Sequence, residues 1–229
     1  MLGKLFIFTK PAEPGKVKTR LIGDLKASET ARLHQSFLQD VCAAASTAKV
    51  ELGIAWALSA DQEVPDGVGD RRIPGLRQQG DGLGERLFQA LKTGAADGSS
   101  VAALGSDHPE ITDETINSAF QLLTDEADVV LGPTPDGGYF LIGLKSAAVQ
   151  ERIFDEIQWS TDSVLSQTLE RCKELGLKVE LLPMGHDIDF PEDLAALIQR
   201  LQETGDASCV HTRAVLQNLG LLQHQERAQ

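Results

Sequence analysis

The segment LFIFTKPAEPGKVKTR, residues 5–20, joins a short apolar run to a loop rich in basic residues. The run Leu5–Phe8 predicts a buried strand. The loop after it carries four cations in a chain whose formal net charge is -13: Lys10, Lys16, Lys18 and Arg20. Positive charge against an acidic background favours an anionic ligand such as a nucleotide phosphate, bound where the first strand of an α/β sheet ends. The alternative is a solvated turn whose lysines face water.

Beyond this loop, apolar runs that predict strands alternate with segments of helical periodicity. The expected strands are residues 50–58, 101–104, 128–131, 139–144 and 178–182, and the clearest helices are 28–46 and 161–175. Further helices are expected to open near residue 80, after Thr112 and after residue 190, while residues 61–79 are expected to be an irregular connection. This order predicts an α/β fold with three layers and a doubly wound, mostly parallel sheet. A turn at residues 136–138 adds antiparallel pairing, which makes the sheet mixed.

Length and composition suit one soluble domain, expected over residues 1–222, with a polar C-terminal tail at 223–229. Asp and Glu number 34 against 21 Lys and Arg, which argues against nucleic-acid or membrane partners. The three cysteines lie in no metal or redox spacing, and we expect Cys42 and Cys172, which fall on apolar helical faces, to pack in the core. No signal peptide or membrane span is recognised, and a cytoplasmic location is the simplest expectation.

Acidic residues follow two of the later predicted strands. Asp107 follows the run 101–104, and Asp187 and Asp189 follow the run 178–182. If these strands are parallel to the first one, the carboxylates and the basic loop converge on the carboxyl edge of the sheet. Carboxylates together with phosphate oxygens are ligands that Mg²⁺ prefers. The sequence therefore predicts Mg²⁺ or Mn²⁺ held by Asp107 and Asp189 against the phosphates of a nucleotide.

Local structure offers other roles for the same residues. Asp107 fits a turn before Pro109. Asp189 fits a helix N-cap, with Glu192 completing a capping box. His108 is either a base beside Asp107 or an exposed turn residue.

Two glycine-containing segments are open to more than one interpretation. GDGLG at residues 80–84 lacks the spacing of a dinucleotide fingerprint and is either a flexible turn or a helix N-terminus that offers N–H groups to a ligand. PDGGY at residues 135–139 is either a tight hairpin turn or a pocket wall. Gly15-Lys16 is not a Walker A loop, because Val17 stands where Ser or Thr is required.

The motifs PAEPGKVKTRL, GDGLGERL, GSDHPEIT, GPTPDGGYFLIGL, WSTDSVLSQTL and HDIDFPEDL occur in the order typical of one bacterial family. The chain resembles the DUF2064 group of the nucleotide-diphospho-sugar transferase superfamily, with a GT-A-type fold, from about Leu2 to Leu201. It is more distantly similar to phospholactate guanylyltransferases and molybdenum-cofactor nucleotidyltransferases. His108 and Phe190 depart from this pattern, since a smaller or hydroxyl residue is expected at both positions.

The resemblance implies a role for each motif. Metal binding falls to Asp107 and Asp189, and catalysis to Lys16, Arg20 and Asp107. Nucleotide-binding residues are Pro14, Gly15, Lys16, Lys18, Arg20, Asp81 and Gly82. Acceptor-binding residues are Glu85, Asp136, Gly137, Gly138 and Tyr139, with Leu83 near the nucleotide or the acceptor.

The sequence thus predicts a Mg²⁺-dependent transferase that uses a nucleotide or nucleotide sugar and a small-molecule acceptor. In the nucleotidyl version the basic loop stabilises departing pyrophosphate, and in the glycosyl version the metal stabilises a departing nucleoside diphosphate. A nucleotide-binding regulator without turnover is the alternative.

Overall fold

The computed structural model describes residues 1–204 and 208–223. The described part contains a seven-stranded sheet in the order β3-β2-β1-β4-β6-β5-β7. These strands are β1 (Lys4–Thr9), β2 (Glu51–Trp56), β3 (Gly75–Arg77), β4 (Val101–Gly105), β5 (Val129–Pro133), β6 (Tyr139–Leu144) and β7 (Val179–Leu181). β6 runs antiparallel to β4 and β5, and the other neighbouring pairs are parallel. The expected mixed, mostly parallel sheet is confirmed.

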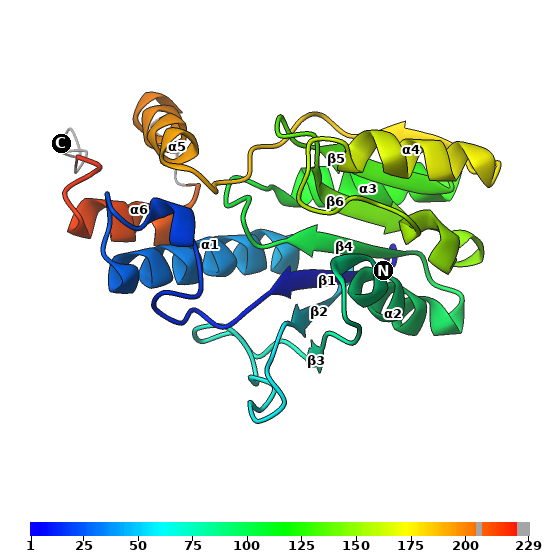
Figure 1. Ribbon diagram of the computed structural model, residues 1–229, viewed down its shortest axis with the longest axis horizontal. Helices are drawn as coiled ribbons and strands as arrows, with labels where there is room; N and C mark the ends of the chain where they lie inside the picture. The colour runs from blue at the N-terminus through cyan, green and yellow to red at the C-terminus, as the bar shows by residue number, and fades with distance from the viewer. Residues whose placement is uncertain (205–207, 224–229) are drawn as a thin grey trace.

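Helices cover both faces of the sheet, giving three layers (Figure 1). One face packs against α1 (Ala27–Thr47) and α3 (Asp113–Asp125), and the other against α2 (Leu83–Gly94) and α4 (Val164–Glu174). The alternation of β1 explains this sandwich: Leu5 and Ile7 join the first cluster, while Phe6 and Phe8 pack against the second. The side chain of Thr112 accepts a hydrogen bond from the N–H of Thr115, so the expected cap of α3 is present.

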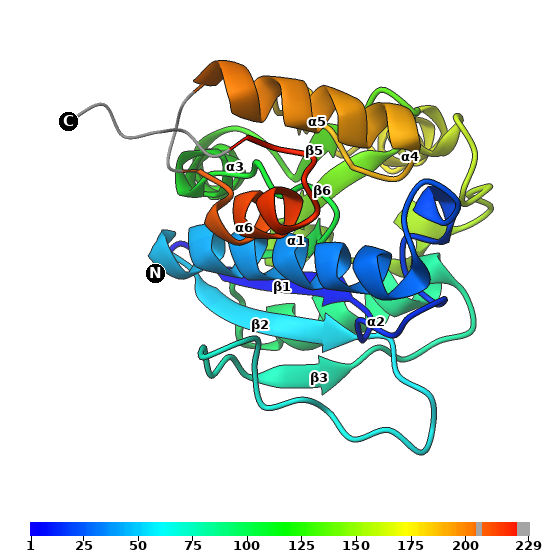
Figure 2. The same cartoon turned by 90° about the vertical axis from the view of Figure 1, so that its left-hand side faces the viewer.

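Two helices near the C-terminus pack away from the sheet. α5 (Pro191–Thr204) and α6 (Val210–Asn218) bury Leu197 and Leu216 against the side of α1 that carries Leu33 and Phe37. Figure 2 shows α6 lying along α1 with α5 beyond it. Through this cluster α5 is fixed near the carboxyl edge of the sheet, which positions the segment that precedes it.

Two elements differ from the sequence prediction. The connection expected to be irregular contains the short strand β3 within residues 61–79, and α6 was not predicted. Of the expected tail, Gln223 is described and residues 224–229 lie outside the described residues. None of the helices in the described ranges is long and apolar enough to span a membrane.

Candidate active site

The carboxyl edge of the sheet brings together five segments that are distant in sequence. Loops follow β1 and β4 at this edge, and the β5–β6 turn lies there because β6 runs in the opposite direction. The segments before α4 and α5 complete the group. The strand order reverses between β1 and β4, which is the switch point where sheets of this type bind ligands.

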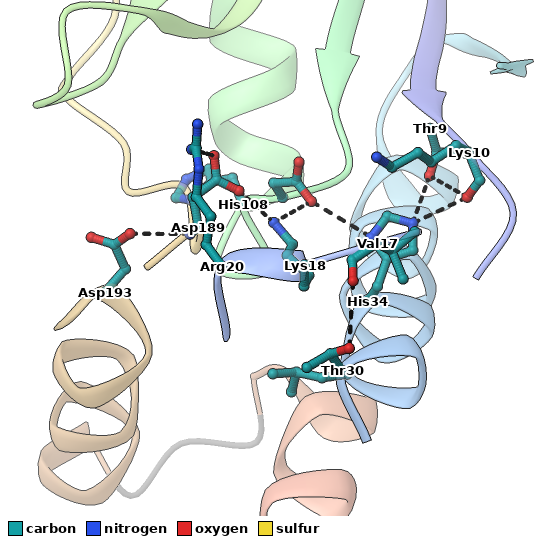
Figure 3. Close-up of polar contacts among 12 residues, drawn as sticks. Thr9, Lys10, Val17, Lys18, Arg20, Thr30, His34, His108, Asp189 and Asp193 are labelled. Atoms are coloured by element: carbon teal, nitrogen blue, oxygen red, sulfur yellow. Dashed lines mark hydrogen bonds and ion pairs between the residues drawn. The ribbon is translucent and has the colours of Figure 1, made fainter. Parts of the chain in front are cut away.

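Lys18 lies at the centre of this edge. Its side chain is 3% exposed, and its Nζ is 2.6 Å from Oδ1 of Asp107 and 2.9 Å from Oδ1 of Asp189 (Figure 3). The backbone of Lys18 is left-handed, with φ at 46°, a conformation that costs a residue with a side chain on the order of 1–3 kcal/mol. A buried ammonium is stable only when it is paired. The loop after β1 therefore accepts backbone strain to place a cation between two carboxylates.

The charges at this point reinforce one another. Burial by itself lowers the pKa of Lys18, but Asp107 and Asp189 outweigh it and hold that pKa above its usual value. Burial raises the pKa of Asp107, yet the charge of Lys18, with a smaller contribution from His34, brings that pKa well below its usual range. Asp107 is therefore an anion, and Lys18 a cation, across the physiological pH range.

His34 is a site residue that the sequence analysis missed. Its Nδ1 is 3.7 Å from Oδ1 of Asp107, and its Nε2 is 3.1 Å from the carbonyl oxygen of Lys10. Nε2 also lies 3.3 Å from Oγ1 of Thr9. Among the described residues Nδ1 has no hydrogen-bond partner. The available signal was a histidine on the apolar stripe of α1, one turn before Phe37 and Leu38.

Asp189 faces Lys18 rather than capping α5. Its Oδ2 is 3.6 Å from the guanidinium of Arg20, which lies 4.6 Å over the ring of Phe190. The cap is formed by Asp193, whose Oδ2 accepts hydrogen bonds from the N–H groups of Asp189 and Phe190 at 3.0 and 2.7 Å. Asp193 thus takes the role considered for Glu192, and the carboxylate of Asp189 is directed to the site (Figure 3).

Asp187 is the third carboxylate at this edge. Its Oδ1 is buried and has no hydrogen-bond partner in the described part of the chain. Burial, followed by the negative charge of Asp107, raises the pKa of Asp187 to about 8. Such a pKa identifies a carboxyl group that needs either a proton or a further positive charge.

Within the described ranges, no group of three or more His, Cys, Asp or Glu side chains is arranged to hold a metal ion. Mg²⁺ commonly uses only one or two protein carboxylates and completes its shell with phosphate oxygens and water. The hard oxygen donors of Asp107 and Asp189, beside the unpartnered oxygen of Asp187, fit that donor set.

The basic loop divides into two parts. Lys16, Pro14 and Gly15 are exposed, and Nζ of Lys16 is 2.5 Å from Oε2 of Glu13. Val17 is fully buried and anchors the loop, so that Lys18 turns inward while Lys16 turns outward. Of the four cations, Lys18 and Arg20 are the ones that the structure brings to Asp189.

The turn before α2 places Asp81 and Gly82 at the surface. The carboxylate of Glu85 accepts a hydrogen bond from the N–H of Asp81 at 2.9 Å, and Nε of Arg86 donates to the carbonyl oxygen of Gly80 at 2.9 Å. In the structure Glu85 thus stabilises the start of the helix. Leu83 faces a hollow of about 400 Å³ that also contacts Arg20 and Asp189.

The β5–β6 turn forms both a hairpin and a wall of this hollow. Asp136 accepts hydrogen bonds from Thr134 Oγ1 at 2.5 Å and from the N–H of Gly138 at 3.1 Å. Gly137 has φ at 84°, and its carbonyl oxygen accepts a hydrogen bond from the N–H of Leu165. The ring of Tyr139 lines the hollow, but burial raises the pKa of its hydroxyl, which has no hydrogen-bond partner among the described residues.

His108 is buried rather than exposed. Its Nδ1 is 3.0 Å from the carbonyl oxygen of His186, and its ring lies 4.9 Å from that of Phe140. Burial lowers the pKa of His108. The residue connects the end of β4 to the segment that carries Asp187 and Asp189, which makes its contacts structural.

A family model for uncharacterized proteins conserved in bacteria, DUF2064, matches residues 38–161. A crystal structure of a candidate nucleotide-diphospho-sugar transferase from Desulfovibrio desulfuricans G20 is 30% identical, with a TM-score of 0.88, over 96% of this chain and 95% of that one. None of the curated proteins matches.

More distant structures share the fold alone. A CMP:2-keto-3-deoxy-manno-octonic acid synthetase complexed with CTP has a TM-score of 0.53 at 13% identity, covering 88% of this chain and 99% of that one. A 2-C-methyl-D-erythritol 4-phosphate cytidylyltransferase from Thermus thermophilus has a TM-score of 0.52 at 16% identity, covering 86% of this chain and 97% of that one.

The fold is that of the nucleotide-diphospho-sugar transferases, and the chain is classed with the transferases. It belongs to the DUF2064 family. The resemblance drawn from the sequence motifs is confirmed.

Proposed function

We propose that this protein transfers a group from a nucleotide-activated donor to a small-molecule acceptor, with Mg²⁺ or Mn²⁺ as cofactor. The observation that carries the proposal is the buried Lys18 ammonium between Asp107 and Asp189 at the switch point of the sheet. Ligands of this fold class bind at that point. Lys18 and Arg20 would bind the donor phosphates, and Asp107 and Asp189 would hold the metal.

The surroundings suggest where the nucleoside would lie. Nε2 of Gln78 donates to the carbonyl oxygens of Ala55 and Thr9, at the ends of β2 and β1. Gln62 donates to the Glu13 carboxylate, which joins the β2–β3 connection to the basic loop. These contacts lie on the β1–β2 side of the site. We place the nucleoside on this side, where Asp81 and Gly82 would contact it. Lys16 would reach a phosphate only after leaving Glu13.

A nucleotide sugar is the donor that this charge arrangement favours. Lys18 and Arg20 are both paired with carboxylates, so the pocket has little positive charge to spare for a triphosphate. An acceptor hydroxyl oxygen would attack the anomeric carbon as the bond to the nucleoside diphosphate breaks. The bonding electron pair would leave with the nucleoside diphosphate, and the hydroxyl proton would pass to a carboxylate that lines the hollow. Lys18 and Arg20 would stabilise the charge that develops on the departing phosphate. A bound divalent cation supplies further neutralisation of that charge.

Calorimetry with nucleoside triphosphates and nucleotide sugars, with and without Mg²⁺, tests the proposal. We expect Mg²⁺-dependent binding of a nucleotide sugar that weakens at least tenfold in Lys18→Met, a loss of about 1.4 kcal/mol. Lys49→Met, an exposed lysine beside the amino end of β2, is the matched control.

Product analysis by mass spectrometry completes the test. Tight binding of a triphosphate and release of pyrophosphate would show that the reaction is nucleotidyl transfer and not glycosyl transfer. Absence of Mg²⁺-dependent binding of any nucleotide would reject both forms of the proposal.

A further inference from the structure

The hollow beside Arg20 and Asp189 extends away from the proposed nucleoside side, between β4 and β6. Its floor comes from these strands, and its walls from the first turn of α2 and the segment before α4. Aromatic and aliphatic side chains make much of the lining, including Phe8, Leu83, Leu87, Tyr139, Phe140 and Trp159. Trp159 packs edge-on to Tyr139, and a Cβ at Gly84 would lie 2.9 Å from its Nε1. The absence of a side chain at Gly84 therefore leaves room for the Trp159 ring in the wall.

The lining of the hollow contains more acidic than basic residues. Among the described residues that line the hollow, Arg20 is the one base, and the acids are Asp136, Asp162, Asp187 and Asp189. Arg20 is already paired with Asp189 and stacked on Phe190. A phosphate or carboxylate entering beyond Arg20 would face several carboxylates and no uncommitted cation. The charge of the hollow opposes an anionic occupant.

One buried group in the lining needs a hydrogen-bond donor. Oδ1 of Asp187 has no partner in the part of the chain that the structure describes, and an unsatisfied buried acceptor costs about 1–3 kcal/mol. A hydroxyl group donates to a carboxylate oxygen, whereas a phosphate oxygen does not. Aromatic rings beside such acceptors suit a molecule that combines hydroxyl groups with an apolar C–H face.

Resting on the transferase activity proposed above, we propose that this hollow is the acceptor subsite and that it takes an uncharged, hydroxyl-rich molecule, a sugar or a polyol. Phosphorylated acceptors are excluded by the excess of acidic over basic side chains in its lining. The hydroxyl groups bind the carboxyl groups of Asp136, Asp162 and Asp187, which all line the hollow. The carbon face packs on Trp159.

The two tryptophans of the chain allow a direct test. Trp56 is buried in β2, so Trp56→Phe leaves Trp159 as the emitter in the hollow. With Mg²⁺ and the best-binding nucleoside diphosphate at saturation, the emission is titrated with methyl glucoside, methyl mannoside and inositol. Glucose 6-phosphate, mannose 6-phosphate and inositol phosphate are the charged counterparts, and glucosamine is the cationic probe. Calorimetry on the unsubstituted protein gives the same ranking independently of Trp56→Phe.

We expect at least one uncharged probe to give a saturable change, with at least tenfold weaker binding of its phosphorylated counterpart. Asp162→Lys should shift this preference toward the phosphorylated probe by at least tenfold. Asp155→Lys is the matched control, because Asp155 is exposed and lies in a separate hollow with Arg152 and Arg171.

Stronger binding of a phosphorylated or amino probe, or no response to any uncharged probe, overturns the proposal. These results are distinguishable from failure of the transferase proposal. If the nucleotide binds with Mg²⁺ and no uncharged probe does, the acceptor assignment alone is rejected. If no nucleotide binds, the transferase proposal itself is rejected.

Discussion

The Nζ atom of Lys18 lies 2.6 Å from Oδ1 of Asp107, which joins the loop after β1 to the end of β4. This contact crosses the switch point of the sheet and brings a buried cation to the place where the strand order reverses. Asp189 adds a second carboxylate at 2.9 Å from a third segment. The ion pairs of Lys18 with Asp107 and Asp189 therefore hold the three segments of the site together, in addition to the pairing of the strands.

Removing the ammonium of Lys18 should destabilise the protein. In Lys18→Met two carboxylates lose a shared cation, and breaking a buried pair is costly. Asp107 and Asp189 are 37% and 41% exposed, so water screens part of the loss, and we expect about 1–3 kcal/mol. Urea unfolding at neutral pH without divalent metal measures it.

Lys16→Met is the matched control for that change. Lys16 is 72% exposed and paired with Glu13, and such surface substitutions usually fall within about 0.5 kcal/mol. Equal losses in the two variants would show that the burial of Lys18 between carboxylates contributes nothing particular to stability.

The pKa of Asp187 predicts an unusual pH dependence. Its folded pKa is raised to about 8 from an unfolded value of about 3.9, so between these values the folded state binds the proton and the unfolded state does not. The Asp187 contribution to stability is therefore full below about pH 4 and is lost as the pH rises toward 8. The slope is at most about 1.4 kcal/mol per pH unit.

Asp187→Asn removes this proton and its pH dependence. The variant should gain stability relative to the unsubstituted protein as the pH rises from 5 to 8, with no further gain above 8. Urea unfolding at four pH values in EDTA tests this sign. A stability difference that is constant over the range would contradict the raised pKa.

The sequence predicted the layers and the edge of the sheet well, because periodicity depends on local residues. Short continuous apolar runs bounded by turn residues, such as residues 101–104, indicate buried strands. β3 was missed because its three residues, Gly75–Arg77, are too few to show alternation. α6 was missed because its burial depends on packing against α1.

The sequence predicted which types of residue gather at the candidate site, but not which of their side chains point into it. Four cations in one loop indicated an anion site, but only the left-handed backbone at Lys18 and the burial of Val17 decide which of them face inward. These features arise from tertiary packing and have no local signature. His34 was missed for the same reason, since its partner Asp107 is distant in the chain.

Substitutions at Asp189 and Asp193 should affect nucleotide binding and stability differently. Asp189→Asn should weaken Mg²⁺-dependent nucleotide binding at least tenfold, because a proposed metal ligand is lost. Asp193→Asn weakens the two hydrogen bonds that cap α5 and should cost about 1 kcal/mol of stability with a smaller effect on binding. Calorimetry and urea unfolding on both variants test this. A larger binding defect in Asp193→Asn would move the metal-binding role away from Asp189.

Gly137 should tolerate no side chain, and Gly15 provides its comparison. Both have positive φ, 84° and 80°, so alanine is strained at either position. A Cβ at Gly137 would also collide with the carbonyl oxygen of Asp162, whereas a Cβ at Gly15 meets no atom within 4 Å among the described residues. We expect Gly15→Ala to cost about 1 kcal/mol and Gly137→Ala more than about 2 kcal/mol.

Gly137→Ala should also disturb the hollow. Its carbonyl oxygen accepts the N–H of Leu165, so displacing the turn moves the start of α4 and the wall that carries Trp159. In the Trp56→Phe background, the emission of Trp159 should change with Gly137→Ala and stay constant with Gly15→Ala. If the two alanine variants lose equal stability and leave the emission unchanged, the close contact between Gly137 and Asp162 does not fix the wall.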